Sequence, residues 1–178
     1  MDVYAEKFKE SIVGEVKRRI INESVPRIKK CLSKLSAEEI WRRPNRETVS
    51  VGNLVLHLCG NVSQWVLSGL GNVPDSRERD LEFSETGENI SADELIKKME
   101  DLMQKVTLVL DNLSPDDLLE TRNVQGFQET GMAILIHVTE HFSYHTGQIT
   151  YYVKASKNVD MNYYEGIEIG RASCRERV

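Results

Sequence analysis

The sequence is poor in cysteine, proline and glycine. It contains 3 cysteines, 4 prolines and 11 glycines in 178 residues. The cysteines are Cys31, Cys59 and Cys174, and no two form a CxxC pair, so neither a disulfide framework nor a zinc ribbon is expected. We interpret Cys31 and Cys59 as small buried apolar residues. With 40% hydrophobic and 29% charged residues, the composition excludes a fibrous or disordered chain and predicts a globular one.

The sequence also lacks an excess of positive charge and a long hydrophobic run. Its formal net charge is −5, which argues against nucleic acid as a partner because such binding needs clustered Lys and Arg. No apolar run approaches the ~18 residues that span a bilayer, and no apolar stretch follows a basic start. We therefore expect a cytoplasmic protein without a membrane partner.

The end of the chain differs from the rest. Residues 169–178 resemble the in-frame translation of a common sequencing adapter. We therefore predict one helical-bundle domain over residues 1–168, followed by a non-native read-through tail over residues 169–178. The alternative is a genuine basic tail.

Hydrophobic residues recur at spacings of three and four in four segments, which predicts four long amphipathic helices. The first covers about residues 3–35, and Pro26 should interrupt it near Ser24 because proline has no amide donor. The second begins at Ser50, a typical helix-capping residue, and ends at the glycines at positions 69 and 71.

The third and fourth long helices follow two irregular connections. Residues 72–89 are charged and show no hydrophobic period, so we predict a long connection there. A capping box at Ser91–Glu94 then begins the third helix, and a similar box at Ser36–Glu39 begins a short one. Residues 121–130 are predicted to be a polar loop, and the fourth helix to cover about residues 131–154. Four such helices favour an all-α bundle.

All four histidines lie in predicted helices. His137, His141 and His145 follow one another at intervals of four residues, and His57 lies in the second helix. Imidazoles four residues apart can bind one metal ion, because their Cβ atoms are about 5–6 Å apart on one face of the helix. A third ligand must come from elsewhere, and His57 is the candidate. By spacing alone, ordinary surface or half-buried histidines explain the pattern equally well.

Three motifs together resemble the DinB-like (DinB/YfiT) superfamily. They are SVGNLVLHL at residues 50–58, RERDLEF at residues 77–83 and HVTEHFSYHTGQI at residues 137–149. The similarity extends in order across nearly all of residues 1–155. It implies a four-helix bundle in up-down-down-up order, with residues 72–89 as the long crossover between the second and third helices.

The resemblance also implies a ligand set and some neighbours. The family's metal triad corresponds to His57, His141 and His145, and the expected cofactor is one divalent ion, Zn or Ni. His137 matches a position that is not normally a ligand. It is expected either to line the pocket beside the ligands or to be an exposed residue without a role in the site.

Several other residues lie near these ligands on the predicted helices. We expect Gln148 to face inward and Gly147 to permit close helix approach, with simple packing as the alternative for both. Tyr144, Glu140 and Asn61 are within helical reach of the ligands, and Trp41 and Trp65 are expected in the core.

Three neutral ligands leave coordination positions open for water or substrate, which is typical of a catalytic metal site. Relatives named by the resemblance include transferases that use a low-molecular-weight thiol, so we expect a thiol S-transferase with a small thiol and an electrophile as partners. A metal-dependent hydrolase, a non-catalytic metal-binding or stress-response protein, and a purely structural helical homodimer are the alternatives.

Overall fold

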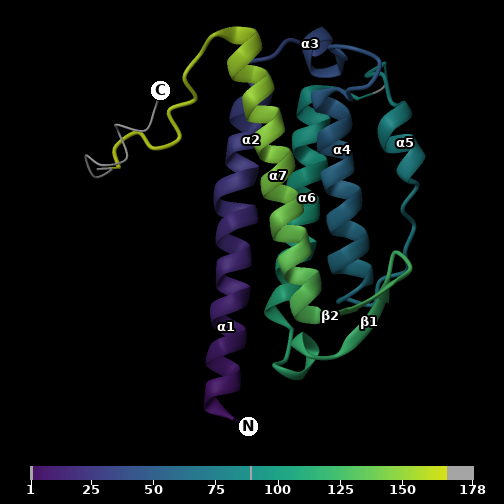
Figure 1. Cartoon of the computed structure of the whole chain (residues 1–178), viewed down its shortest axis with the longest axis vertical. Coiled ribbons are helices and arrows are strands. Elements are labelled where there is room, and N and C mark those ends of the chain that lie inside the picture. Colours follow the sequence, from purple (N-terminus) through teal and green to yellow (C-terminus); the bar gives the residue numbers. More distant parts are fainter. Residues whose placement is uncertain (1, 89, 168–178) are drawn as a thin grey trace.

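The computed structural model describes residues 2–88 and 90–167, and these residues are mostly helical (Figure 1). The elements follow in the order α1 (Val3–Lys17), η1 (Arg18–Ser24), α2 (Val25–Leu32), α3 (Ala37–Trp41), α4 (Val51–Val62), η2 (Ser63–Ser68), α5 (Arg79–Ser84), α6 (Ala92–Asp111), η3 (Asp116–Leu118), β1 (Thr121–Val124), β2 (Phe127–Thr130) and α7 (Gly131–Lys157). The segments η1 and η2 are π-helical and η3 is a 3-10 turn. The mainly helical class predicted from the sequence is confirmed.

Helix α4 is the most buried of the long helices. It contacts α6 and α7, and α2 contacts the same two helices (Figure 1). In α4 every residue except Gly60 is buried. The apolar sequence of this helix reflects that position, since burying a Leu or Val side chain contributes roughly 1.5–3 kcal/mol. The polar side chains of Asn53, His57 and Asn61 are therefore carried into the interior.

The predicted interruption near Pro26 is present, but the chain does not leave the helix. Residues Arg18–Ser24 form the π-helical segment η1, and α2 begins at Val25 with the proline in its first turn. The Ser24 hydroxyl donates a hydrogen bond to the carbonyl of Arg19 at 2.8 Å. Pro26 has no N–H to donate, so one backbone hydrogen bond is missing here. The wider π-helical turn of η1 accommodates this loss, and the helix continues.

Two segments predicted to be irregular contain regular structure. Helix α5 lies within the long connection of residues 72–89, and residues 121–130 form an antiparallel hairpin rather than a polar loop. The hairpin turn, Gln125 and Gly126, has φ values of 52° and 84°. A two-residue turn with positive φ at both positions matches the twist of paired strands. The fold is thus mostly helical, as predicted, with one small two-stranded sheet that the all-α prediction did not include.

The predicted helix starts agree with the structure. Reciprocal capping boxes form at Ser36–Glu39 and at Ser91–Glu94, and Ser50 caps α4 in the same way with Asn53. Helix α7 continues to Lys157, past its predicted end at residue 154. There the Lys157 ammonium contacts the Glu39 carboxylate at 2.6 Å, which ties the end of α7 to α3.

Some predictions fall on residues that the structure leaves out. The boundary at residues 168 and 169, the proposed tail and Cys174 all lie outside the described residues. Among the residues that are described, no helix combines the length and the apolar character that crossing a membrane requires.

Gly87 holds the connection after α5 against α3. Its φ is 89°, and a Cβ on this residue would lie 2.0 Å from Cδ1 of the Trp41 ring. Gly126 has a similar φ of 84°, but a Cβ there would meet nothing within 4 Å. An alanine at Gly126 would therefore suffer backbone strain alone, whereas an alanine at Gly87 would suffer both backbone strain and a steric clash.

We predict that Gly126→Ala lowers the free energy of unfolding by about 1–2 kcal/mol, the cost of placing an alanine in the left-handed region. Gly87→Ala should lower it by about 1–3 kcal/mol more, because the indole must also move. Urea unfolding of both variants measures the difference. Equal losses would show that Trp41 does not pack on Gly87 as described.

Candidate metal centre

Three histidines meet between α4 and α7. One ligand nitrogen from each of His57, His141 and His145 lies within 4.8 Å of the other two. The Nε2 atoms of His57 and His141 are 3.0 Å apart, and the His141 and His145 ring centroids are 4.5 Å apart. His141 and His145 are one helical turn apart on α7, and the contact of α7 with α4 brings them to His57. The structure thus brings together the three residues that the sequence singled out.

A carboxylate fixes the orientation of the His57 ring. Nδ1 of His57 lies 2.9 Å from Oε2 of Glu82, which belongs to α5. A carboxylate only accepts hydrogen bonds, so the contact with Glu82 needs the Nδ1–H of His57 as donor. Nη2 of Arg77 also lies 3.1 Å from Nδ1, but it has the Glu82 carboxylate as its acceptor at 2.9 Å, so Nδ1 keeps its proton. The lone pair is then on Nε2, the atom that faces His141. A carboxylate behind a histidine is the usual support for a metal ligand, because it sets the tautomer and raises the basicity of the ring.

The Glu82 carboxylate is itself held by Arg77. The Arg77 Nε–H donates to Oε1 at 2.7 Å and Nη2 donates to Oε2 at 2.9 Å, with side-chain exposures of 4% for Arg77 and 9% for Glu82. Burial alone would raise the pKa of Glu82, but hydrogen bonds from Arg77 and His57 outweigh it and lower the pKa. The carboxylate is therefore charged, and the guanidinium balances that charge.

Gly60 leaves room for this ion pair. It lies one turn after His57 on α4, and a Cβ there would be 1.8 Å from Oε1 of Glu82 and 3.0 Å from Nε of Arg77. Any larger residue would push the carboxylate off the helix. The absence of a side chain at position 60 is thus what allows α5 to reach His57.

The two histidines of α7 are neutral. Burial and the nearby charges of His145, His57, His137 and Arg77 lower the pKa of His141 to about 3. Burial also lowers the pKa of His145, whose Nδ1–H donates to Oε1 of Gln148 at 2.7 Å. That bond leaves Nε2 of His145 as the free donor atom. Three converging imidazole nitrogens suit Zn²⁺ and Ni²⁺, and histidine binds a metal as the neutral ring, so this donor set fits a divalent ion.

The comparisons with known proteins agree with this fold. Residues 9–172 match the family model described as "Protein of unknown function (DUF1572)", a DinB-like family. The chain belongs to this DinB-like family. A crystal structure of a DinB-like protein from Bacillus cereus ATCC 10987 is similar, with a TM-score of 0.62 and 16% sequence identity over 79% of this chain and 89% of that one. At that identity the likeness shows the fold alone. No curated protein matches the chain.

In this DinB-like protein His137 lies beside the triad but outside it. Its ring stacks on Trp65 with centroids 3.7 Å apart, and its Nε2 is 3.4 Å from Nδ2 of Asn61. The Trp65 Nε1–H in turn donates to Oε1 of Gln125 in the hairpin at 3.1 Å. Trp65 is buried, as predicted. The hairpin that sequence reasoning missed therefore holds the tryptophan on which His137 rests.

The predictions for Gly147 and Gln148 were wrong. A Cβ on Gly147 would meet nothing within 4 Å, so no close helix approach depends on this glycine. Gln148 is exposed rather than inward, and it acts on the site only through its bond to His145. Tyr144 is 62% exposed, with its ring centroid 5.0 Å from that of His145, and Glu140 is exposed.

Sequence reasoning also missed Glu82 and Arg77 as parts of the site. Both belong to the RERDLEF motif at residues 77–83, but nothing in the local pattern of that charged connection shows that α5 folds back onto α4. The available signal was a glycine one turn after a buried histidine, together with an acidic residue followed by Phe83. The Phe83 ring lies 5.0 Å from the His57 ring, which places Glu82 against the same histidine.

We predict that His57→Ala, His141→Ala and His145→Ala each lose the bound zinc, whereas His137→Ala retains it. Each of the first three removes one of the converging nitrogens, and His137 contributes none. Elemental analysis after zinc loading and desalting gives the occupancy, and far-UV circular dichroism checks that each variant is folded. Full occupancy in folded His141→Ala would show that His137 is the true partner of His145, or that no such site exists.

We further predict that Glu82→Gln weakens zinc binding by about 10–100-fold, because the His57 ring loses its charged acceptor. Glu78→Gln is the matched control, since it removes a carboxylate from the same connection without touching His57. A chelator competition titration of the folded variants measures both affinities. If the two substitutions weaken binding equally, Glu82 does not support the ligand.

Proposed function

We propose that His57, His141 and His145 bind one divalent ion, Zn²⁺ or Ni²⁺, and that the protein is an enzyme that uses it to activate a low-molecular-weight thiol for S-transfer. The observation that carries the proposal is the charge of the ligand set. Histidine binds a metal as the neutral ring, and the carboxylate behind His57, Glu82, is already balanced by Arg77. The charge of a bound ion would therefore stay uncompensated and would favour an anionic ligand at an open position.

A thiolate is such an anion. When bound, the ion would lower the pKa of a coordinated thiol, ordinarily about 8.5, and so supply thiolate at neutral pH. The residues around it have separate tasks: Glu82 keeps the His57 tautomer, Gln148 orients His145, and burial keeps His141 neutral. None of them is required to remove the thiol proton, which passes to solvent.

The two cysteines that the structure describes do not supply the nucleophile. Cys31 and Cys59 are both buried and free. Burial raises the pKa of Cys59 to about 12, and it also raises that of Cys31. Both thiols are therefore protonated at neutral pH, which supports an external thiol as the attacking group.

The reaction that follows is a substitution at an electrophilic carbon. The thiolate sulfur attacks a carbon that bears a leaving group such as chloride. A carbon–sulfur bond forms, the carbon–chlorine bond breaks, and chloride departs with the electron pair. No oxidant or reductant is needed.

We also propose that the four long helical segments form the up-down-down-up bundle expected for the family. The contacts of α4 and α2 with both α6 and α7 support this order, as does the course of the chain past α5 to the start of α6 (Figure 1). A homodimer remains a prediction.

We predict that the zinc-loaded protein consumes a chloronitrobenzene only in the presence of a low-molecular-weight thiol. His57→Ala should abolish this activity, and Glu78→Gln should leave it unchanged. Absorbance of the thioether product measures the rate. Activity that survives His57→Ala undiminished would contradict the mechanism, and cleavage of esters or amides without thiol would favour a metal-dependent hydrolase instead.

A further inference from the structure

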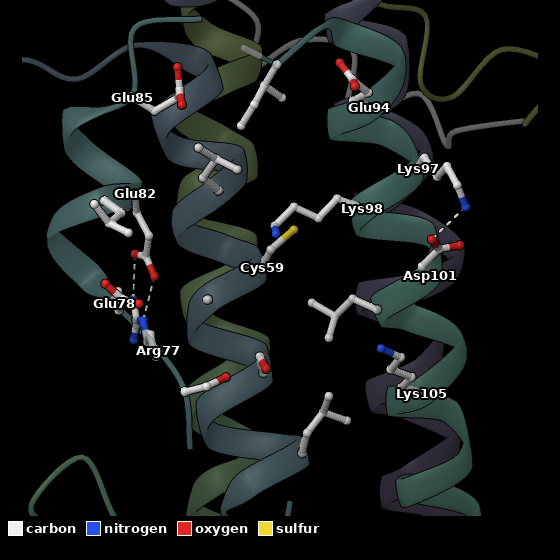
Figure 2. A pocket seen from close by; sticks show the side chains of 18 residues that line it. Cys59, Arg77, Glu78, Glu82, Glu85, Glu94, Lys97, Lys98, Asp101 and Lys105 are labelled. Carbon is white, nitrogen blue, oxygen red and sulfur yellow. Dashed lines mark hydrogen bonds and ion pairs between the residues drawn. The ribbon is translucent and has the colours of Figure 1, made fainter. Parts of the chain in front are cut away.

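A cleft of about 710 Å³ lies between α4, α5 and α6 (Figure 2). None of the three histidines lines it. It touches the metal centre only through Arg77 and Glu82, which form part of the α5 wall. Ligand pockets for small organic molecules have volumes of roughly 300–1,000 Å³, so this cleft is large enough for one.

The floor and part of the α6 wall are apolar. Leu56 and Leu67 come from the α4 side and Leu102 from α6, and each of these side chains is less than 10% exposed. Cys59 also lies on the floor. Because burial keeps its thiol neutral, this residue acts as a further apolar surface and not as a nucleophile.

Most of the carboxylates around the cleft already have partners. Glu82 is paired with Arg77, and Asp101 accepts a hydrogen bond from Lys97 at 2.8 Å. Glu94 caps α6 through Ser91, and Glu85 accepts the backbone N–H groups of Thr86 and Gly87. The remaining carboxylate, Glu78, lies beside Arg77 on the opposite wall (Figure 2).

Two lysines of α6 that line the cleft, Lys98 and Lys105, differ from these carboxylates in their pairing. Within residues 2–88 and 90–167, neither Lys98 nor Lys105 forms an ion pair or a hydrogen bond through its ammonium group. Lys98 extends across the cleft toward Cys59, and Lys105 follows further along the same helix (Figure 2). Seven residues are two helical turns, so the two side chains stand on one face about 10.5 Å apart along the axis.

We propose that this cleft is a second binding site, for a small organic anion whose acidic group lies between Lys98 and Lys105 and is attracted by both, and whose apolar body lies on Leu56, Leu67 and Leu102. Lys98 and Lys105 are exposed cations without an ion pair in the described part of the chain, beside an apolar floor. This arrangement complements a carboxylate, sulfonate or phosphate on a hydrophobic scaffold. The proposal goes beyond the metal chemistry and does not depend on it.

The test uses the purified full chain and the fluorescent probe anilinonaphthalene sulfonate, with neutral phenylnaphthylamine as its uncharged analogue. We expect saturable binding of one sulfonate per chain and at least about threefold weaker binding of the neutral probe. Lys98→Gln and Lys105→Gln should each weaken sulfonate binding by about three- to tenfold. Lys97→Gln is the matched control, since Lys97 lines the same cleft but is paired with Asp101, and it should change binding less than twofold.

Folding of each variant is checked by circular dichroism, because unfolded chains also bind such dyes. The proposal is overturned if no saturable binding occurs, if both probes bind equally well, or if Lys97→Gln weakens binding as much as Lys98→Gln. Because an anion could also bind at a loaded metal site, the titration is repeated on His57→Ala, and the same sulfonate binding is expected since His57 does not line the cleft. If the sulfonate does not bind in the cleft, the proposed metal chemistry is unaffected. If the metal site is absent, sulfonate binding in the cleft is still expected.

Discussion

The contact between Nδ1 of His57 and the Glu82 carboxylate is the interaction on which the candidate site depends. It joins the most buried helix, α4, to α5, a short helix in the connection between α4 and α6. The carboxylate can reach the histidine only because position 60 is glycine. It stays charged there because Arg77 donates two hydrogen bonds to it and His57 donates a third. Removing one partner of such a buried pair commonly costs about 3–5 kcal/mol, since the other charge is left uncompensated.

The same contact sets the electrostatics of the centre. A carboxylate bound directly to the ion would reduce its charge, whereas Glu82 lies behind His57 and is balanced by Arg77. Because histidine binds a metal as the neutral ring, three such ligands would leave the full charge of a divalent ion to act on the next ligand. Because Glu82 supports His57 and does not bind the ion itself, the site favours an anionic substrate.

The sequence predicted the features that depend on local spacing. Histidines four residues apart on α7 must share a face, and the capping boxes at Ser91 and Ser36 depend only on residues within one turn. The hairpin was missed because its strands, Thr121–Val124 and Phe127–Thr130, are four residues each, too short for an alternating pattern to stand out.

The roles of Glu82 and Gln148 could not be read from the sequence for a different reason. A glutamate among charged neighbours looks solvated, and only the fold of α5 onto α4 shows that it is buried. Gln148 was expected to face inward because it lies close to His145 on the helix, yet it reaches His145 from the exposed side. Each side chain acts on a ligand through a hydrogen bond to its Nδ1 atom. Whether such a bond forms depends on the tertiary fold for Glu82 and on the side-chain rotamer for Gln148, and neither can be read from residue spacing.

Crystals grown with zinc, with anomalous diffraction recorded on both sides of the zinc absorption edge, test the central claim most directly. The account predicts one zinc ion bound by nitrogen atoms of His57, His141 and His145 at about 2.0–2.1 Å, with Glu82 on Nδ1 of His57 and not on the ion. An ion bound by His137, an ion bound directly by Glu82, or no anomalous peak between α4 and α7 would contradict it.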